Sequence, residues 1–380
     1  MEKFVCPNCG NSNPRYIGIK NHKPYCRLCV TMKPKEKLIP QINQKPCKVA
    51  LSYALTNEQK NIAVKVCEEY QKHYNVLIYA VTGAGKTELI YGVMQYALTH
   101  GMQVGFAVPR REVAIELYDR INESFVYNSV CCVCGGHHDV LVADIVVLTT
   151  HQLYRYENFF DLLILDEIDA FPFKDNQLLN SMFFKSIRGN YVLMSATPNK
   201  ETLNYFKRDG HTLLTLKTRY HNHVIPVPVL IKESGINKYI ELVKNISRLI
   251  KNNKRVFVFT PTISECENLY LYLSKFIKNG NYVHSKRMNQ SSIIKQFKNG
   301  NFKYLVTTAV LERGITVKGL QVIIFNADHR IYDEYSLVQI AGRVGRKIDE
   351  PEGEVIFIAN KETNEIKKAI ATIRECNAHL

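Results

Sequence analysis

Residues 80–87, with the sequence AVTGAGKT, constrain this chain more than any other segment. They follow an apolar run at residues 75–79, and the residues after them place apolar side chains at a period near 3.6. The pattern predicts a buried strand, a glycine-rich loop and a helix. Glycines in such a loop let backbone N–H groups approach phosphates, because no Cβ intervenes. The segment therefore predicts a nucleoside triphosphate site, with a fortuitous turn as the alternative.

The loop also supplies two side chains suited to a triphosphate and its metal ion. Lys86 can reach the β- and γ-phosphates, and the hydroxyl of Thr87 can ligate Mg²⁺. We expect the rest of the loop to surround the phosphates, namely Ala80, Val81, Thr82, Gly83, Ala84 and Gly85.

Paired carboxylates follow a second apolar run, at residues 162–165. Ligands of open α/β sheets bind at the carboxyl ends of the strands. We therefore expect Asp166 to hold Mg²⁺ and Glu167 to orient and deprotonate an attacking water. An acidic helix start is the alternative. Ser195 and Thr197 follow a third apolar strand, and we expect their hydroxyls to bond the carboxylates that hold Mg²⁺.

Residues 339–346, with the sequence QIAGRVGR, lie in the second half of the chain. Arg343 and Arg346 are three residues apart and share one helical face. Guanidinium groups placed across a domain cleft can stabilise charge on the γ-phosphate, so we assign catalytic roles to both arginines and to Gln339. A solvated basic helix is the alternative.

Apolar strands alternate with helices in two successive blocks, separated by a breaker at residues 221–229 that contains two prolines. Such alternation predicts an α/β fold with parallel sheets covered on both faces. We expect a zinc-binding module at 1–30, a basic linker at 31–55 and two α/β domains at 56–225 and 226–380.

Four cysteines near the N-terminus form two Cys-x-x-Cys pairs separated by 16 residues. Cys6, Cys9, Cys26 and Cys29 can close a tetrahedral zinc site of the ribbon type, with a structural role because four thiolates leave no open position. The basic and aromatic residues around them suit contact with a single strand, and docking onto another protein is the competing interpretation.

Another cluster contains Cys131, Cys132, Cys134, His137 and His138. Its spacing is too tight for one tetrahedral metal site, and neighbouring strand residues point to opposite faces. We interpret these as free cysteines on a buried strand.

Charge and composition constrain the kind of binding partner and the cellular compartment that we expect. The formal net charge is +15, and residues 1–48 carry ten Lys or Arg against two acidic residues. This concentration favours a polyanion such as nucleic acid, and a solubilising surface is the alternative. No apolar run reaches the ~18 residues of a membrane span. Without a secretory signal in MEKFVCPNCG, we expect a cytoplasmic protein whose eleven cysteines are thiols and metal ligands.

Taken together, six motifs resemble those of superfamily 2 helicases of the DEAD/DEAH type. They occur in the order AVTGAGKT, PRREV, DEID, SATP, TTAVLERGIT and QIAGRVGR. The four cysteines, RYHNHVIPVP at 219–228 and VHSK at 283–286 make the chain similar to the ComFA family of late competence proteins. The resemblance departs from the general pattern at Ala80, where glycine is usual, and in DEID, which matches neither DEAD nor DEAH.

This resemblance implies two tandem RecA-like domains and an ATP-dependent single-stranded DNA translocase that drives DNA uptake in bacterial competence. It implies a Gln59 contact to adenine and places Gly314 near the nucleotide. It also implies a nucleic-acid path along Arg110, Thr149, Thr150 and Arg313.

The same resemblance implies the competence proteins ComFC and DprA as partners, at the inner face of the membrane. The alternatives are a duplex-unwinding DNA helicase similar to PriA, acting in replication or repair, and an ATP-gated nucleic-acid-binding adaptor.

Overall fold

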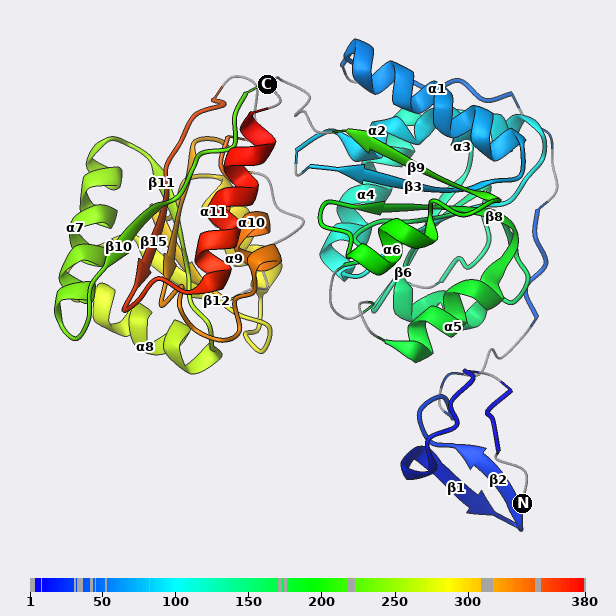
Figure 1. Cartoon of the computed structure of the whole chain (residues 1–380), viewed down its shortest axis with the longest axis horizontal. Coiled ribbons are helices and arrows are strands. Elements are labelled where there is room, and N and C mark those ends of the chain that lie inside the picture. Colours follow the sequence, from blue (N-terminus) through cyan, green and yellow to red (C-terminus); the bar gives the residue numbers. More distant parts are fainter. Residues whose placement is uncertain are drawn as a thin grey trace. The chain divides into compact units, whose positions relative to one another are not determined.

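The chain forms two compact units, one built on residues up to Leu216 and the other on residues after it (Figure 1). We call their α/β parts domain 1 and domain 2, and the cysteine-bearing residues 4–30 the ribbon. The computed structural model describes the chain apart from residues 1–3, 8, 31, 33–36, 42–43, 45, 52, 82, 138, 170–172, 174–175, 217–222, 309–316, 346–349 and 379–380.

Domain 1 is a seven-stranded, wholly parallel sheet in the order β5-β6-β4-β7-β8-β3-β9. Its central strands are buried along nearly their whole length, as expected for a sheet covered on both faces. The strands are β3 (Asn75–Ala80), β4 (Val104–Val108), β5 (Val130–Val133), β6 (Ile145–Thr149), β7 (Phe160–Leu165), β8 (Ile187–Ser195) and β9 (His211–Leu216).

Helices cover both faces of this sheet (Figure 1). One face packs against α1 (Asn57–Gln71), α3 (Tyr91–Thr99) and α4 (Arg111–Ser124). The other carries the 3₁₀ helix η2 (Thr150–Arg155), α5 (Gln177–Ser186) and α6 (Lys200–Tyr205). The short helix α2 (Lys86–Leu89) follows β3, so the single helix expected after the glycine-rich loop is divided at Ile90.

The strand order positions the site. Since β8 lies between β7 and β3 and all three run parallel, their carboxyl ends meet at one edge of the sheet. The glycine-rich loop leaves β3, the paired carboxylates leave β7, and Ser195 ends β8. The three motifs, far apart in sequence, are therefore neighbours in the fold.

Domain 2 is a six-stranded parallel sheet in the order β10-β15-β14-β11-β13-β12. Two apolar cores lie on its two faces, one including residues of α7 and α8 and the other residues of α9, α10 and α11. Its strands are β10 (Val229–Lys232), β11 (Arg255–Phe259), β12 (Gly280–Val283), β13 (Tyr304–Thr307), β14 (Leu320–Phe325) and β15 (Val355–Ala359). Its helices are α7 (Asn237–Lys251), α8 (Ile263–Leu273), α9 (Gln290–Lys298), α10 (Glu334–Ala341) and α11 (Asn364–Asn377).

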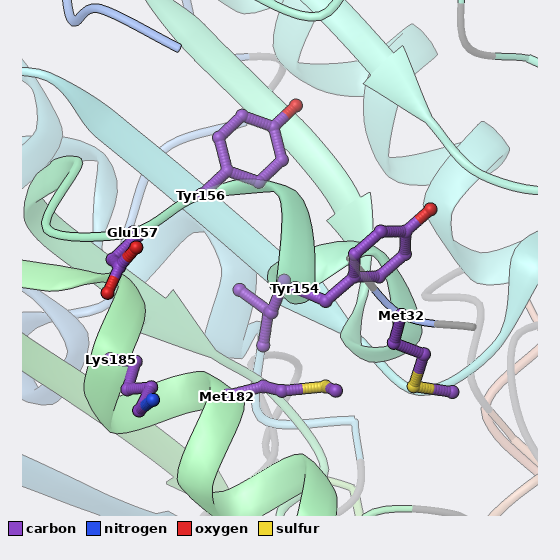
Figure 2. A pocket seen from close by; sticks show the side chains of 7 residues that line it. Met32, Tyr154, Tyr156, Glu157, Met182 and Lys185 are labelled. Carbon is purple, nitrogen blue, oxygen red and sulfur yellow. The ribbon is translucent and has the colours of Figure 1, made fainter. Parts of the chain in front are cut away.

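The ribbon is a 3₁₀ turn, η1 (Pro14–Tyr16), followed by an antiparallel hairpin of β1 (Ile17–Lys20) and β2 (Lys23–Cys26). It contacts domain 1, where Lys185 donates to the carbonyl of Pro7. Met32, just after the ribbon, lines a small pocket with residues of η2 and α5. Figure 2 shows its side chain near those of Tyr154 and Met182.

Parts of the expected linker are bound along domain 1. The backbone N–H of Ala50 donates to the Ser124 carbonyl at 2.9 Å, and the Gln95 side chain donates to the Cys47 carbonyl at the same distance. Through these bonds the described residues between 46 and 50 follow the surface of domain 1. In the described part of the chain, every helix is too short or too polar to cross a bilayer.

Candidate active site

The glycine-rich loop turns tightly between β3 and α2. Gly83 and Gly85 have φ values of 83° and 72°, which glycine adopts without the strain that other residues incur. A Cβ on Gly85 would lie 2.6 Å from Nε2 of Gln59 and 3.0 Å from the hydroxyl of Tyr53. The loop is thus closed against α1 and the segment before it, and Lys86 opens α2 beside that contact.

Gln59 makes two structural contacts, one at the start of α1 and one at the glycine-rich loop. Its Oε1 accepts from the backbone N–H of Thr56 at 2.9 Å, while the Thr56 hydroxyl accepts from the Gln59 N–H, so the pair caps α1. Its amide nitrogen lies over Gly85, at the loop. Tyr53 joins it there although the sequence reasoning did not select it. The only signal was its position six residues before Gln59.

Asp166 and Glu167 follow β7 at the same edge. Withdrawal from water raises the pKa of Asp166 to about 6; the positive charge of Lys86 opposes this shift and the Glu167 charge adds to it. Glu167 has a φ of 58°, in the left-handed region that is costly for a side chain of this kind. Backbone strain of this kind concentrates at functional sites. Lys86 and Asp166 are thus electrostatically coupled, as a phosphate and metal site requires.

The hydroxyls after β8 bond a different carboxylate from the one expected. Ser195 Oγ donates to Asp169 at 2.7 Å, and Thr197 Oγ1 donates to the other oxygen of the same carboxylate at 2.7 Å. We expected them to bond the carboxylates that hold Mg²⁺. Asp169 lies two residues beyond Glu167, so the hydroxyls hold the end of the acidic loop rather than Asp166, the expected Mg²⁺ ligand.

The proposed nucleic-acid residues of domain 1 lie at this edge with different exposures. Arg110 is half-buried between β4 and α4. Thr149 and Thr150 end β6 and open η2, but they are only 6% and 0% exposed. Both residues are therefore largely withdrawn from solvent, and of these three Arg110 offers the most accessible contact.

In domain 2, Gln339 lies in α10 and Arg343 follows it, with exposures of 4% and 2%. A buried guanidinium requires partners, and Arg343 has them. Thr82, Gly314, Arg313 and Arg346 lie outside the described residues.

The donor chemistry at the domain 1 edge fits Mg²⁺. Thr87 offers a hydroxyl and Asp166 a carboxylate, at the ends of strands separated by one strand. Mg²⁺ prefers hard oxygen ligands, and it commonly takes one or two from protein while keeping waters and phosphate oxygens.

The four ribbon cysteines converge. Cys6 and Cys29 have sulfurs 3.5 Å apart, those of Cys9 and Cys26 are 3.6 Å apart, and all four lie within 4.8 Å of one another. Sulfurs around tetrahedral zinc are roughly 3.8 Å apart, given Zn–S bonds near 2.3 Å. All four thiols are at most 5% exposed. Burial alone would raise the pKa of Cys26, but N–H donors from Leu28 and Cys29 lower it to about 7. The cluster is compatible with zinc.

The second cysteine cluster does not assemble a comparable site. Cys132 and Cys134 have sulfurs 3.8 Å apart at the end of β5, while Cys131 is buried, and burial raises its pKa to about 12. Among the described residues, only the ribbon cysteines bring three or more metal-ligating groups together. His138 lies outside them.

Comparison with known proteins agrees with this geometry. Residues 57–205 match the DEAD/DEAH box helicase family, and residues 237–347 match the helicase conserved C-terminal domain. Yeast Dbp5 (S. cerevisiae), bound to RNA and ADP BeF3, superposes with a TM-score of 0.64 at 17% identity, covering 86% of this chain and 93% of that one. RecG bound to a three-way DNA junction gives a TM-score of 0.63 at 20% identity, covering 89% of this chain and 47% of that one. Both share the fold of two RecA-like domains.

Proteins of similar sequence identify the family, whereas the similar structures show only the fold. Competence protein ComFA of Bacillus subtilis is 31% identical over 99% of this chain and 86% of its own length. ComFA of Streptococcus pneumoniae is 31% identical over 99% of this chain and 90% of its own. Replication restart protein PriA of Rickettsia conorii is 27% identical over 61% of this chain and 39% of its own. The chain therefore belongs to the ComFA family of competence proteins and is a helicase-type ATPase with two RecA-like domains.

Proposed function

We propose that the protein is an ATP-dependent translocase that moves along single-stranded DNA and drives DNA uptake during competence. The observation that carries the proposal is the meeting of three motifs at the ends of β3, β7 and β8. Membership of the ComFA family supplies the biological setting.

Each residue of the edge has a role in the proposed reaction. Lys86 and the loop backbone hold the phosphates of ATP, and Thr87 and Asp166 would hold Mg²⁺, which neutralises phosphate charge when bound. Glu167 orients the attacking water and accepts its proton. Arg343, with Arg346 and Gln339, completes the site from domain 2 in the hydrolysis step, where guanidinium groups stabilise charge on the γ-phosphate.

Asp169 gives this proposal a coupling element. Its carboxylate is held by the hydroxyls of Ser195, which ends the neighbouring strand β8, and of Thr197, two residues further on. A shift of the acidic loop during hydrolysis would pull on the end of β8 through these two bonds. Arg110 and Arg313 would grip DNA phosphates, so binding should depend little on sequence and weaken as salt rises.

The rate of ATP hydrolysis with and without single-stranded DNA tests this proposal. We expect stimulation by DNA, and loss of turnover in Glu167→Gln with nucleotide binding retained. Hydrolysis that ignores added DNA would contradict translocation and favour the adaptor. Robust hydrolysis by Glu167→Gln would refute the assigned base.

A second candidate is duplex unwinding, favoured by the partial similarity to PriA. A strand-displacement assay on forked DNA separates the two. Efficient displacement would favour the helicase, and DNA-stimulated hydrolysis without displacement would favour the translocase.

We also propose that the ribbon binds one structural Zn²⁺ through Cys6, Cys9, Cys26 and Cys29. So short a segment has little apolar core, so the metal would supply its folding energy. Removing zinc with a strong chelator should unfold the ribbon while the two domains keep their structure, as amide exchange would show. Unchanged protection of the ribbon after verified metal loss would contradict this.

As partners we propose the competence proteins ComFC and DprA, with action in the cytoplasm at the inner face of the membrane. Support comes from the family alone. Co-purification of the intact chain with each protein tests the first point, and fractionation of membranes tests the second.

A further inference from the structure

Glu88 presents an unusual buried carboxylate next to the glycine-rich loop. It is 5% exposed, on α2 two residues after Lys86. Its Oε1 accepts from the guanidinium of Arg120 on α4. Its Oε2 is buried and has no hydrogen-bond partner among the residues that the structure describes. One half of the carboxylate is therefore satisfied, and the other half is available for a donor.

The neighbour of Oε1 is a cation, because the guanidinium of Arg120 is always charged. Burial alone would lower the pKa of the Arg120 guanidinium, yet the neighbouring Glu88 raises it above its ordinary value. As the partner of this guanidinium, the carboxylate of Glu88 presents acceptor oxygens. Leaving a buried acceptor unsatisfied is unfavourable, so an N–H or O–H donor from a ligand would be strongly favoured at Oε2.

Three side chains converge at the same place. An ideal Cβ on Gly85 would lie 2.6 Å from Nε2 of Gln59, 3.0 Å from the hydroxyl of Tyr53 and 3.7 Å from Oε2 of Glu88. They come from three elements, the segment before α1, α1 itself and α2. An amide, a phenol ring and an acceptor thus surround one face of the loop.

The carboxylate of Glu88 disfavours phosphate as its ligand. Phosphate oxygens are acceptors, and they would repel the carboxylate of Glu88. The part of a nucleotide that suits this place is flat and carries a donor. An amide can pair with the edge of a purine, and a tyrosine can pack on its face.

We propose that Glu88 selects the base of the nucleotide, accepting a hydrogen bond from the 6-amino group of adenine and rejecting purines that carry a 6-oxo group. This deepens the proposed ATPase function and rests on it. In a 6-oxo purine the carbonyl oxygen would face Oε2, so that two acceptors would meet in a buried position. The wild type should therefore prefer ATP to inosine triphosphate by at least ~100-fold in kcat/KM.

The decisive variant is Glu88→Gln. Its amide oxygen can keep the bond from Arg120, while the NH₂ replaces Oε2 and turns the acceptor into a donor. We expect the ATP/ITP ratio to fall roughly 10- to 100-fold, the effect of one charge-assisted hydrogen bond. The change should lie mainly in KM. Glu123→Gln, at the exposed end of α4, is the matched control and should keep the wild-type ratio.

The ribose hydroxyls are the other donors of a nucleotide, and 2′-deoxy-ATP distinguishes them. A Glu88→Gln variant that keeps the ATP/ITP ratio but changes the ATP/2′-deoxy-ATP ratio would overturn base selection. Equal use of ATP and ITP by the wild type would overturn it too. Thermal protection of the wild type by ATP and by ITP measures selection without any variant, and equal protection would count against the proposal.

Lys86→Ala separates this inference from the proposed function. If that variant still hydrolyses ATP at the wild-type rate, the nucleotide site itself is misassigned. If it is inactive while Glu88→Gln keeps the wild-type selectivity, only the role of Glu88 fails.

Discussion

The two domains of this chain have similar folds, but the loops at the ends of their corresponding strands differ in chemistry. Each is a parallel sheet between two layers of helices, with β3 in one and β11 in the other leading into a loop and a helix. After β3 the loop is rich in glycine and ends at Lys86. After β11 the residues are Thr260, Pro261 and Thr262.

The loop after β11 satisfies its own polar groups. The Thr260 N–H donates to the Thr307 carbonyl at 2.8 Å, and the Thr262 hydroxyl caps α8 by accepting from the Glu265 N–H at 3.2 Å. Those groups are already bonded within domain 2, whereas the glycine-rich loop has a left-handed backbone at Gly83 and Gly85 and lies beside Gln59 and Tyr53. The comparison shows that chemistry on this fold resides in the loops at the strand ends.

Substitutions in these two corresponding loops should give the largest difference in the rate of ATP hydrolysis. Lys86→Ala should lower kcat/KM for ATP hydrolysis by at least ~100-fold, because a preorganised positive contact to the phosphates is lost. Thr262→Ala should cost about 1 kcal/mol of stability through the lost helix cap and leave hydrolysis without DNA nearly unchanged. Steady-state kinetics and thermal unfolding of both variants measure this, and similar kinetic losses would remove the distinction between the loops.

Two ion pairs, one in each domain, should differ in how much they stabilise their domains, and this difference is smaller than the kinetic one. In domain 1, Arg188 binds both oxygens of Asp161, with side chains 29% and 19% exposed; Arg248 and Glu354 pair in domain 2 at 44% and 46% exposure. Because Arg188 and Asp161 are less exposed, less water competes with the hydrogen bonds between them. Arg188→Ala should destabilise its domain by about 1 kcal/mol, and Arg248→Ala by less than half of that.

Amide exchange in β8 and in β15 reports the two effects separately, which avoids treating a two-domain chain as a single transition. A larger loss of protection in domain 2 would reverse the expected order.

The smallest effect concerns pH. The hydrogen bond from Arg248 lowers the pKa of Glu354 below its ordinary 4.5. A carboxyl with a lowered folded-state pKa stabilises the fold above its unfolded pKa, and this contribution disappears as the pH falls through the lowered value. Between pH 7 and pH 3, domain 2 should lose up to ~0.5 kcal/mol that Glu354→Gln does not lose. Amide exchange in β15 across this range is the measurement, and identical pH dependence in both proteins would contradict it.

Sequence reasoning succeeded where strands were continuously apolar and motifs adjoined them. The strand before the loop, the strand before Asp166 and the sheet class follow from local pattern, and the structure contains them. It did not predict β9, whose mixed polar and apolar residues form an edge strand through pairing with β3. Pairing between distant segments leaves little trace in a local pattern.

The contacts within the candidate site were harder to predict from the sequence than the residues that form it. Tyr53 and Glu88 belong to none of the six helicase motifs, and the packing of α1 and the segment before it against α2 brings them to Gly85. The choice of Asp169 as the partner of Ser195 and Thr197 depends on the path of the acidic loop after β7. Such details come from tertiary structure, which residue types and spacing do not encode directly.

The left-handed backbone at Glu167 has a consequence for the evolution and engineering of this chain. Most residues other than glycine lose about 1–2 kcal/mol in that conformation, so the fold itself would favour glycine at this position over an acid. A glycine there would relieve the penalty and remove the carboxylate that we propose as the catalytic base. Screens for thermal tolerance alone should therefore drift toward inert proteins at this position.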